Sequence, residues 1–280
     1  MGSQWVTYRV IIIGLMAICH LNATTRISQQ AFTAFNGGNL VQMKNPASAA
    51  SLSQSQWLTQ YHTGYGVIKT STLGWGRPIG ETMGVSVEWP TTVISDISHR
   101  DDAGNALGTY SDIAVDPIMR WAKRWGRVSV GSAIRTHYQR ILNETGRGID
   151  IDVGALVTLS ELTIGVSVGN LVSRTKWTTG KHDLRHRVGH LGVAFPLRDM
   201  EVMTDVDWVF SAESIAINTA VLIPLHYRIH VIMGVNDLTQ TRHLTQHIRL
   251  MLSSSFYIDY TYAAHAALGG SHAVGVRVSL

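Results

Sequence analysis

One pentapeptide, Gly165-Val166-Ser167-Val168-Gly169, has residue types and spacing that could serve nucleophilic catalysis. It matches the G-x-S-x-G pattern, in which a sharp strand-to-helix turn exposes a serine hydroxyl. Here the pentapeptide lies within a stretch that alternates apolar and polar or small residues from Leu162 onward, which is typical of a strand. A serine in the middle of a strand lacks the exposed turn that the chemistry requires. The pattern therefore favours a structural serine, and we predict that the protein is not an enzyme.

Two carboxylates, Asp150 and Asp152, are the second candidate feature, because residues two apart share one face of a strand. Such a pair could bind a hard cation through its oxygens. It could also form ion pairs with an arginine on the preceding strand, for which Arg127 and Arg135 are the candidates. We favour the ion pairs and predict no metal site.

Histidine is the third feature, with 13 residues in the chain. None has the H-E-x-x-H spacing with which two histidines bind zinc. His230, His243, His247 and His265 alternate with apolar residues, as polar residues on the inner face or at the rim of a barrel would. We therefore predict no catalytic residues, no metal and no cofactor.

Composition narrows the class of protein that could carry these residues. Only 15% of the 280 residues are charged, against about 25% in a typical soluble domain. Apolar residues make up 45% of the chain, and it has 26 glycines and one cysteine, which excludes a disordered chain, a disulfide scaffold and a coiled coil. The net charge of +4 comes without a run of Lys or Arg, so we expect no nucleic-acid partner.

The first 23 residues are typical of a secretory signal peptide. Arg9 precedes the apolar run 10–18, and small residues follow near Ala23. The run has about ten residues, too few for a helix that spans a bilayer, which needs about 20. Cys19 lies inside this segment; lipidation of Cys19 is the alternative, but Ile18 stands where a lipoprotein signal has a small residue. No later stretch is suited to a transmembrane helix, so any membrane span must consist of strands.

The rest of the chain alternates with period two, which predicts an all-β fold with one apolar and one polar face. We expect about fourteen strands, each of about nine to thirteen residues, a length that suits tilted strands crossing a membrane. Their approximate ranges are 55–62, 65–76, 82–90, 109–123, 126–139, 147–159, 162–172, 186–197, 200–210, 214–223, 227–236, 243–253, 256–264 and 271–280.

The connections between these strands alternate in length, as they do in outer-membrane barrels. Every second connection is short: 77–81, 124–126, 160–161, 198–199, 224–226 and 253–255. The opposite set contains the longer connections 90–107, 138–146, 173–185 and 236–242, although two of its members, 62–64 and 211–213, are short. A soluble β-sandwich is the alternative, but its strands are shorter, at about five or six residues. We therefore predict an antiparallel up-and-down transmembrane β-barrel for residues 55–280.

Residues 24–54 precede the first predicted strand and do not alternate. They are rich in small residues and contain the turn signals Asn36-Gly37 and Asn45-Pro46. A segment tethered at the periplasmic end of a barrel could fold into the lumen as a hatch, in which Phe32 and Phe35 would anchor the segment or contact an apolar ligand. A loose periplasmic leader is the alternative.

The motif Asn45-Pro46-Ala47, followed by small residues before the first strand, resembles the FadL-like outer-membrane β-barrel superfamily and, within it, the PorV/PorQ-like branch. The segments 150–155, 168–171 and 258–272 share this resemblance. It implies a barrel of 14 strands with an N-terminal hatch/plug, located in the bacterial outer membrane after cleavage of the signal peptide. FadL-like members take up hydrophobic compounds, while PorV-type members serve type IX secretion.

The expected function is passive transport of hydrophobic or amphipathic small molecules across the outer membrane. The alternative is a secretion or assembly component that acts through protein partners. The expected partners are accordingly outer-membrane lipid and either a hydrophobic small molecule or a protein of the secretion machinery. The predicted ligand-binding or hatch residues are Phe32, Phe35, Asn45, Pro46 and Ala47, and the predicted polar residues facing the lumen are Asp150, Asp152, Arg228, His230, Arg249 and Asp259.

Overall fold

The computed structural model describes residues 33–34, 43–101, 103–212, 214–238, 243–265 and 269–280. Within them the chain forms one 3-10 helix and sixteen β-strands. No helix among these residues has the length and apolar character needed to cross a membrane. The predicted signal peptide and most of the predicted hatch lie outside the described residues.

The elements follow in the order 3-10 helix Pro46–Ser51, β1 (Gln56–Gly64), β2 (Ile68–Ile79), β3 (Met83–Arg100), β4 (Ala106–Val115), β5 (Ile118–Trp125), β6 (Val128–Ile141), β7 (Glu144–Leu159), β8 (Leu162–Trp177), β9 (His182–Asp183), β10 (Val188–Leu197), β11 (Met200–Val209), β12 (Ser214–His226), β13 (Ile229–Asn236), β14 (His243–Met251), β15 (Phe256–His265) and β16 (Gly269–Ser279).

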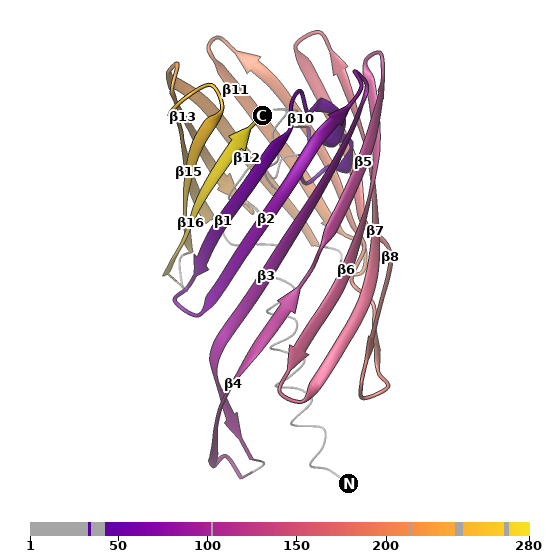
Figure 1. Ribbon diagram of the computed structural model, residues 1–280, viewed down its shortest axis with the longest axis vertical. Coiled ribbons are helices and arrows are strands. Elements are labelled where there is room, and N and C mark those ends of the chain that lie inside the picture. The colour runs from indigo at the N-terminus through magenta and orange to yellow at the C-terminus, as the bar shows by residue number, and fades with distance from the viewer. Residues whose placement is uncertain (1–32, 35–42, 102, 213, 239–242, 266–268) are drawn as a thin grey trace.

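The strands form one closed antiparallel barrel (Figure 1). Except at β4, β5 and β9, each strand pairs with its neighbours in sequence; β8 pairs with β10, and the barrel closes where β1 pairs with β16. Strands β4 and β5 follow one another at a single position in the wall, since both pair with β3 and β6. The two-residue strand β9 pairs only with the end of β8 and is not part of the closed wall. The wall therefore has the fourteen strand positions that the alternation predicts.

The break between β4 and β5 falls at Asp116 and Pro117, opposite Pro90 of β3. Proline has no backbone N–H to donate to a strand ladder, so two prolines at the same level interrupt the pairing. One hydrogen bond bridges the break, from the Asp116 N–H to the Pro90 carbonyl at 3.1 Å. The interruption divides the strand predicted at 109–123 into two.

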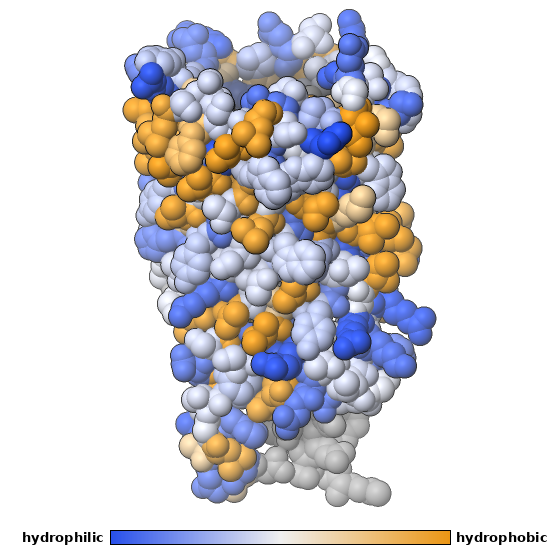
Figure 2. All heavy atoms as spheres, in the orientation of Figure 1, coloured by the Kyte–Doolittle hydropathy of each residue, from blue (hydrophilic) through white to orange (hydrophobic). Residues whose placement is uncertain are grey.

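Alternate residues along each strand point to opposite sides of the wall, as predicted. In β7 and β8, Asp150 and Ser167 are 0% and 3% exposed on the inner side, whereas Val166 is 46% exposed on the outer side. Large aromatic residues gather on the outer side; those with the highest exposure include Trp57, Tyr61, Trp89, Trp125 and Phe210. Figure 2 shows apolar side chains spread over the outer wall, with strongly hydrophilic ones concentrated at the upper rim and in the lower third.

The two ends of the barrel differ. At the termini end, where β1 begins and β16 ends, the connections between strands are short turns. At the opposite end, called here the hairpin end, β3 and β4 extend well below the rest of the wall (Figure 1). Strands β6, β7 and β8 also reach far in this direction, to Ile141, from Glu144 and to Trp177.

Much of what the sequence predicts as long loops at 90–107, 138–146 and 173–185 is therefore strand. The reason is that the extensions leave the closed wall and meet water on both sides. In β3, residues beyond Pro90 are half-exposed or exposed on either face, so the apolar–polar alternation disappears. The backbone ladder continues nevertheless, for example between Ser98 and Thr109.

Candidate functional site

The described part of the N-terminal segment packs against the inner surface of the wall near the termini end. The 3-10 helix Pro46–Ser51 contacts β2, β3, β5, β6 and β7, and Figure 1 shows it inside the upper part of the barrel. Five of its six residues, Pro46 to Ala50, are buried. Met43, Ala49, Ala50 and Leu52 form an apolar cluster with Ala122 of β5.

Asn45 fixes the start of this helix and ties it to the wall. Its backbone is extended, with φ −98° and ψ 119°, which is the geometry that a following proline imposes. Its side-chain oxygen caps the helix by accepting from the Ala47 N–H at 3.0 Å. Its amide nitrogen donates to the carbonyl of Ala155 in β7 at 2.9 Å and to that of Thr33 at 3.1 Å. Asn45 is fully buried, so these bonds satisfy a polar group that has no access to water.

Glycines in the wall allow the segment to lie this close. A Cβ atom on Gly84 of β3 would lie 1.8 Å from the carbonyl oxygen of Ala49, and one on Gly131 of β6 would lie 2.5 Å from the Ala47 nitrogen. On Gly154 of β7, directly opposite Gly131, it would lie 2.2 Å from Asn45 Oδ1. We call Gly84, Gly131 and Gly154, together with Gly165 of β8 and Gly192 of β10, the glycine seat.

Gly165 and Gly192, which pair with each other, receive Thr33 and Ala34. A Cβ on Gly165 would lie 2.1 Å from the Thr33 carbonyl oxygen, and one on Gly192 would lie 2.9 Å from the Ala34 nitrogen. Ala34 is fully buried in a cluster that includes Met203 and Ile232. Any side chain larger than hydrogen at these wall positions would push the segment away.

Two carboxylates of β11 hold the segment electrostatically. Asp205 Oδ2 accepts from both the backbone N–H and the hydroxyl of Thr33, each at 2.8 Å. The ammonium of Lys44 donates to Asp205 at 2.8 Å and to Asp207 at 2.6 Å. Burial alone would lower the pKa of Lys44, but the charges of Asp207 and Asp205 outweigh it and raise that pKa above its ordinary value. Lys44 therefore stays charged as a tether between segment and wall.

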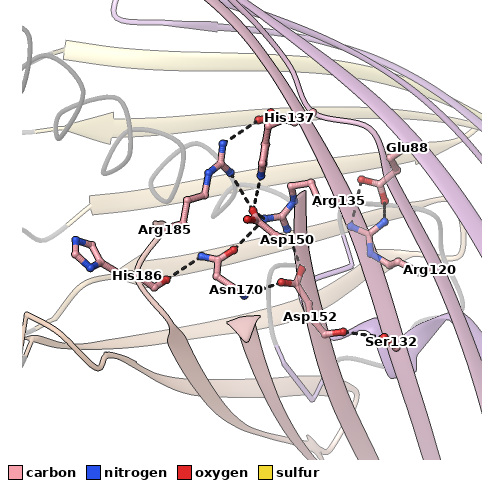
Figure 3. A network of polar contacts seen from close by, with 11 residues as sticks. Glu88, Arg120, Ser132, Arg135, His137, Asp150, Asp152, Asn170, Arg185 and His186 are labelled. Carbon is pink, nitrogen blue, oxygen red and sulfur yellow. Dashed lines mark hydrogen bonds and ion pairs between the residues drawn. The ribbon is translucent and has the colours of Figure 1, made fainter. Parts of the chain in front are cut away.

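A second polar cluster lies on the inner side of β6, β7 and β8, with Asp150 at its centre (Figure 3). Arg135 lies 3.0 Å from Asp152 and 3.7 Å from Asp150. The ring of His137 bridges two acids: Nδ1 lies 2.6 Å from Asp116, and Nε2 forms a very short contact with Asp150. Both ring nitrogens of His137 thus face a carboxylate, and Arg135 faces two, so basic and acidic side chains alternate through the cluster.

Two further clusters complete the charged inner wall. Arg120 of β5 pairs with Glu88 of β3 at 2.7 Å, and both are nearly fully buried. On the other side of the barrel, Arg249 of β14 donates from Nε to Asp259 of β15 at 2.8 Å. Next to them Arg277 of β16 lies over the ring of Tyr257, 4.3 Å from its centre. Among the described residues, no group of three or more His, Cys, Asp or Glu is arranged to hold a metal ion.

Four of the polar residues predicted to face the lumen are buried on the inner wall: Asp150, Asp152, Arg249 and Asp259. His230 is half-buried on the same side, opposite Arg249. Arg228 is not on the wall; it is exposed in the turn between β12 and β13, beside Tyr227. β12 ends at His226 and β13 begins only at Ile229, so Arg228 belongs to the turn that joins them.

Of the predicted hatch residues, Asn45, Pro46 and Ala47 lie in the packed segment, whereas Phe32 and Phe35 lie outside the described residues. The side chains of His243 and His265 also lie outside them. Asp150 and Asp152 do pair with Arg135, but not with Arg127, which lies in the turn between β5 and β6. The register explains the choice, because Arg135 is directly opposite Asp150.

Sequence reasoning missed Lys44 and its two acids. Asp205 and Asp207 repeat the two-residue spacing of Asp150 and Asp152, and this signal could have identified them. The partner of Asp205, 172 residues away at Thr33, has no such signal. The glycine seat was also missed, because its members are adjacent only through the register between strands.

Comparison with known proteins gives no matching family model and no matching curated protein. Solved structures do match. The CymD monoaromatic hydrocarbon channel has a TM-score of 0.66 and 11% identity over 89% of this chain and 94% of that one. The Pseudomonas putida toluene transporter TodX has a TM-score of 0.65 and 8% identity over 90% and 95%. The Ralstonia pickettii toluene transporter TbuX has a TM-score of 0.53 and 9% identity over 85% and 92%.

At identities this low the likeness concerns the fold, and it covers nearly the whole of each channel. None of these matches points to the PorV/PorQ-like branch. The chain thus shares the barrel fold of those hydrocarbon channels.

Proposed function

We propose that the protein is an outer-membrane channel for passive transport of hydrophobic or amphipathic small molecules, with residues 24–54 as its hatch. The observation that carries the proposal is a closed fourteen-position barrel, alike in fold to hydrocarbon channels, with part of its N-terminal segment packed inside it. The signal peptide, residues 1–23, is removed on export in this proposal.

The outer surface supports placement in a membrane. Large apolar side chains such as Leu73, Val166 and Leu191 are 45% or more exposed on the outer wall. A soluble protein rarely leaves such a surface in water, whereas lipid chains would cover it. Outer-membrane barrels have short periplasmic turns, which supports assigning the termini end, and with it the packed segment, to the periplasmic side.

The width of the barrel supports a transport role for the segment. Side chains alone fill a barrel of about eight strands, whereas a wider one leaves a lumen. A polar lumen of that width conducts water and ions unless something occupies it. The contacts of Lys44, Asn45 and Thr33 with the wall tie the segment there by hydrogen bonds and ion pairs. Such bonds can break and form again without unfolding the barrel, as a gate requires.

A role in type IX secretion has no support from the comparisons, and no feature of the described residues favours it. The two functions differ in what passes through the lumen. A small molecule needs only partial displacement of the hatch, whereas a protein would need its complete removal.

Uptake of labelled toluene tests the function. Cells that express the protein should take up toluene at low external concentration faster than cells that lack it. A chain deleted for residues 26–44 should still assemble and should show raised single-channel conductance in planar bilayers. Toluene uptake independent of the protein would refute the transport role. Unchanged, near-zero conductance of an assembled deletion would refute the hatch.

A further inference from the structure

Four arginines are buried on the inner wall in the described part of the chain: Arg120, Arg135, Arg249 and Arg277. The first three each have an acidic partner. Arg120 lies 2.7 Å from Glu88, Arg135 lies 3.0 Å from Asp152, and Arg249 lies 2.8 Å from Asp259.

Arg277 differs from the other three. Only 1% of it is exposed, yet no described carboxylate lies within 4 Å of its guanidinium, and neither Nε nor Nη1 has a hydrogen-bond acceptor. Burying a charge without a partner costs free energy that the other three arginines avoid through their acids. Nε and Nη1 of Arg277 could therefore donate to an acceptor that the described residues do not supply.

The charged groups around Arg277 carry an excess of positive charge, which also favours an acceptor that is an anion. Asp259 lies in the field of both Arg249 and Arg277, and its Oδ1 already accepts from Arg249. Two guanidinium groups and one carboxylate leave one surplus positive charge. Protonation of His247, which lies 3.2 Å from Asp259, would only add to it. An anion is the ligand that this surplus favours.

The two residues directly opposite Arg277 on the neighbouring strands are aromatic and apolar, whereas the buried residues diagonal to it, Gln56 and Gln60, are polar. Strands β15, β16 and β1 lie side by side in the wall (Figure 1), with Tyr257 directly opposite Arg277 on one side and Leu58 on the other. The Tyr257 ring covers the guanidinium, and Leu58 is only 3% exposed. The Cβ atoms of directly opposite residues are about 5 Å apart, so Leu58 and Tyr257 are the nearest apolar and aromatic side chains for a ligand bound to the guanidinium.

We propose that Arg277 binds the carboxylate of an amphipathic solute, and that the apolar body of this solute lies against Leu58 and Tyr257. Small aromatic carboxylates, of which benzoate is the simplest, combine these two features. A guanidinium forms charge-assisted hydrogen bonds with a carboxylate, and low local polarity strengthens them. This inference rests on the proposed transport function and names a class of solute for it.

Calorimetric titration of the purified full-length barrel tests the proposal, with benzoate, its uncharged analogue benzamide, and acetate as ligands. Benzoate should bind about tenfold more tightly than benzamide, because only benzoate offers the charge, and more tightly than acetate, because only benzoate has the ring. Equal binding of benzoate and benzamide would overturn the assignment of Arg277. Equal binding of benzoate and acetate would overturn the part assigned to Leu58 and Tyr257.

Variants assign the preference to one residue. Arg277→Met should abolish the preference for benzoate over benzamide, and Arg277→Lys should retain it. The double variant Glu88→Gln/Arg120→Met removes another buried inner-wall arginine together with its acid, and it should retain the preference as the matched control. A preference that survives in Arg277→Met would refute the site. The comparison of ligands on the unaltered protein stands even if a variant fails to assemble.

Toluene uptake separates this inference from the proposed function. Toluene carries no charge, so its uptake by the unaltered protein tests the transport function without depending on the Arg277 guanidinium. Loss of benzoate preference in Arg277→Met, together with toluene uptake by the unaltered protein, supports both statements. Absence of toluene uptake in the unaltered protein would refute the transport function whatever the calorimetry shows.

Discussion

Replacing Gly131 by alanine should release the hatch without weakening the barrel. The new Cβ would lie 2.5 Å from the Ala47 nitrogen and from the Pro46 carbonyl carbon, both of them backbone atoms that cannot rotate away. Ordinary contacts are about 3.5–4.0 Å, so the segment must move by about 1 Å or more. Overpacking of this kind costs about 1–3 kcal/mol.

That cost falls on the packed state of the hatch alone. It should raise the fraction of barrels with a displaced hatch by about 5- to 150-fold, since 1.4 kcal/mol corresponds to a factor of ten. The wall itself should gain slightly, because alanine is favoured over glycine within a strand by about 0.5–1 kcal/mol. Single-channel recording in planar bilayers should therefore show more frequent open events with unchanged resistance of the barrel to denaturant.

Gly275→Ala provides the matched control. Gly275 also lies on the inner wall, but its Cβ would meet nothing closer than 3.6 Å, so the closed state should persist. A second readout uses Ala49→Cys, because the mature chain has no other thiol if residues 1–23 are removed. A maleimide should label this buried position faster when Gly131 is alanine. Equal labelling and equal conductance in Gly131→Ala and Gly275→Ala would show that the glycine seat does not hold the hatch.

Three further predictions concern charge and the outer surface. Lys44→Met should raise the open probability in single-channel recordings, because it removes the ion pairs of Lys44 with Asp205 and Asp207. In the unaltered protein these ion pairs should be fully present below pH 10.5, the ordinary pKa of lysine. They should be lost only as the pH rises through the still higher pKa of packed Lys44. Arg120→Met should lower the free energy of unfolding by about 3–5 kcal/mol because it leaves Glu88 buried without its partner, and adding Glu88→Gln should restore most of it in urea unfolding from vesicles; an unchanged single variant would contradict this. Val166→Arg should cost about 2–4 kcal/mol in reversible folding into lipid, because Val166 faces outward, and no cost at all would contradict the assignment of this face to lipid.

The strands of the wall were predictable because apolar and polar residues alternate along each strand, according to whether a residue faces outward or inward. Val166 and Ser167 differ in polarity since one faces outward and the other inward, and the same holds along β7 around Asp150. The extension of β3 beyond Pro90 could not be predicted, because both of its faces meet water. The predicted position of Arg228 was wrong because the alternation continues in sequence through the turn and does not mark Ile229 as the first residue of β13.

The site was less predictable than the wall, because it depends on contacts between distant residues. Asn45 and Pro46 signal a turn and a cap locally, and both are found. The ion pair between Lys44 and Asp205 depends on the position of β11 in the closed barrel, which the local sequence does not indicate. Likewise, Gly84 and Gly131 form one surface only after three strands have paired in a fixed register.

The position of the packed segment also constrains the order in which the molecule is built. Each wall strand can pair with a strand that precedes it in the chain, so hairpins can add in sequence, and only β1 with β16 must join distant ends. The N-terminal segment precedes β1 in the sequence, yet the acidic residues that it binds belong to β11. Its docking must therefore wait until most of the barrel exists. Until then Asp205 and Asp207 lack the lysine they pair with, so late docking leaves an interval in which an almost complete barrel is still open.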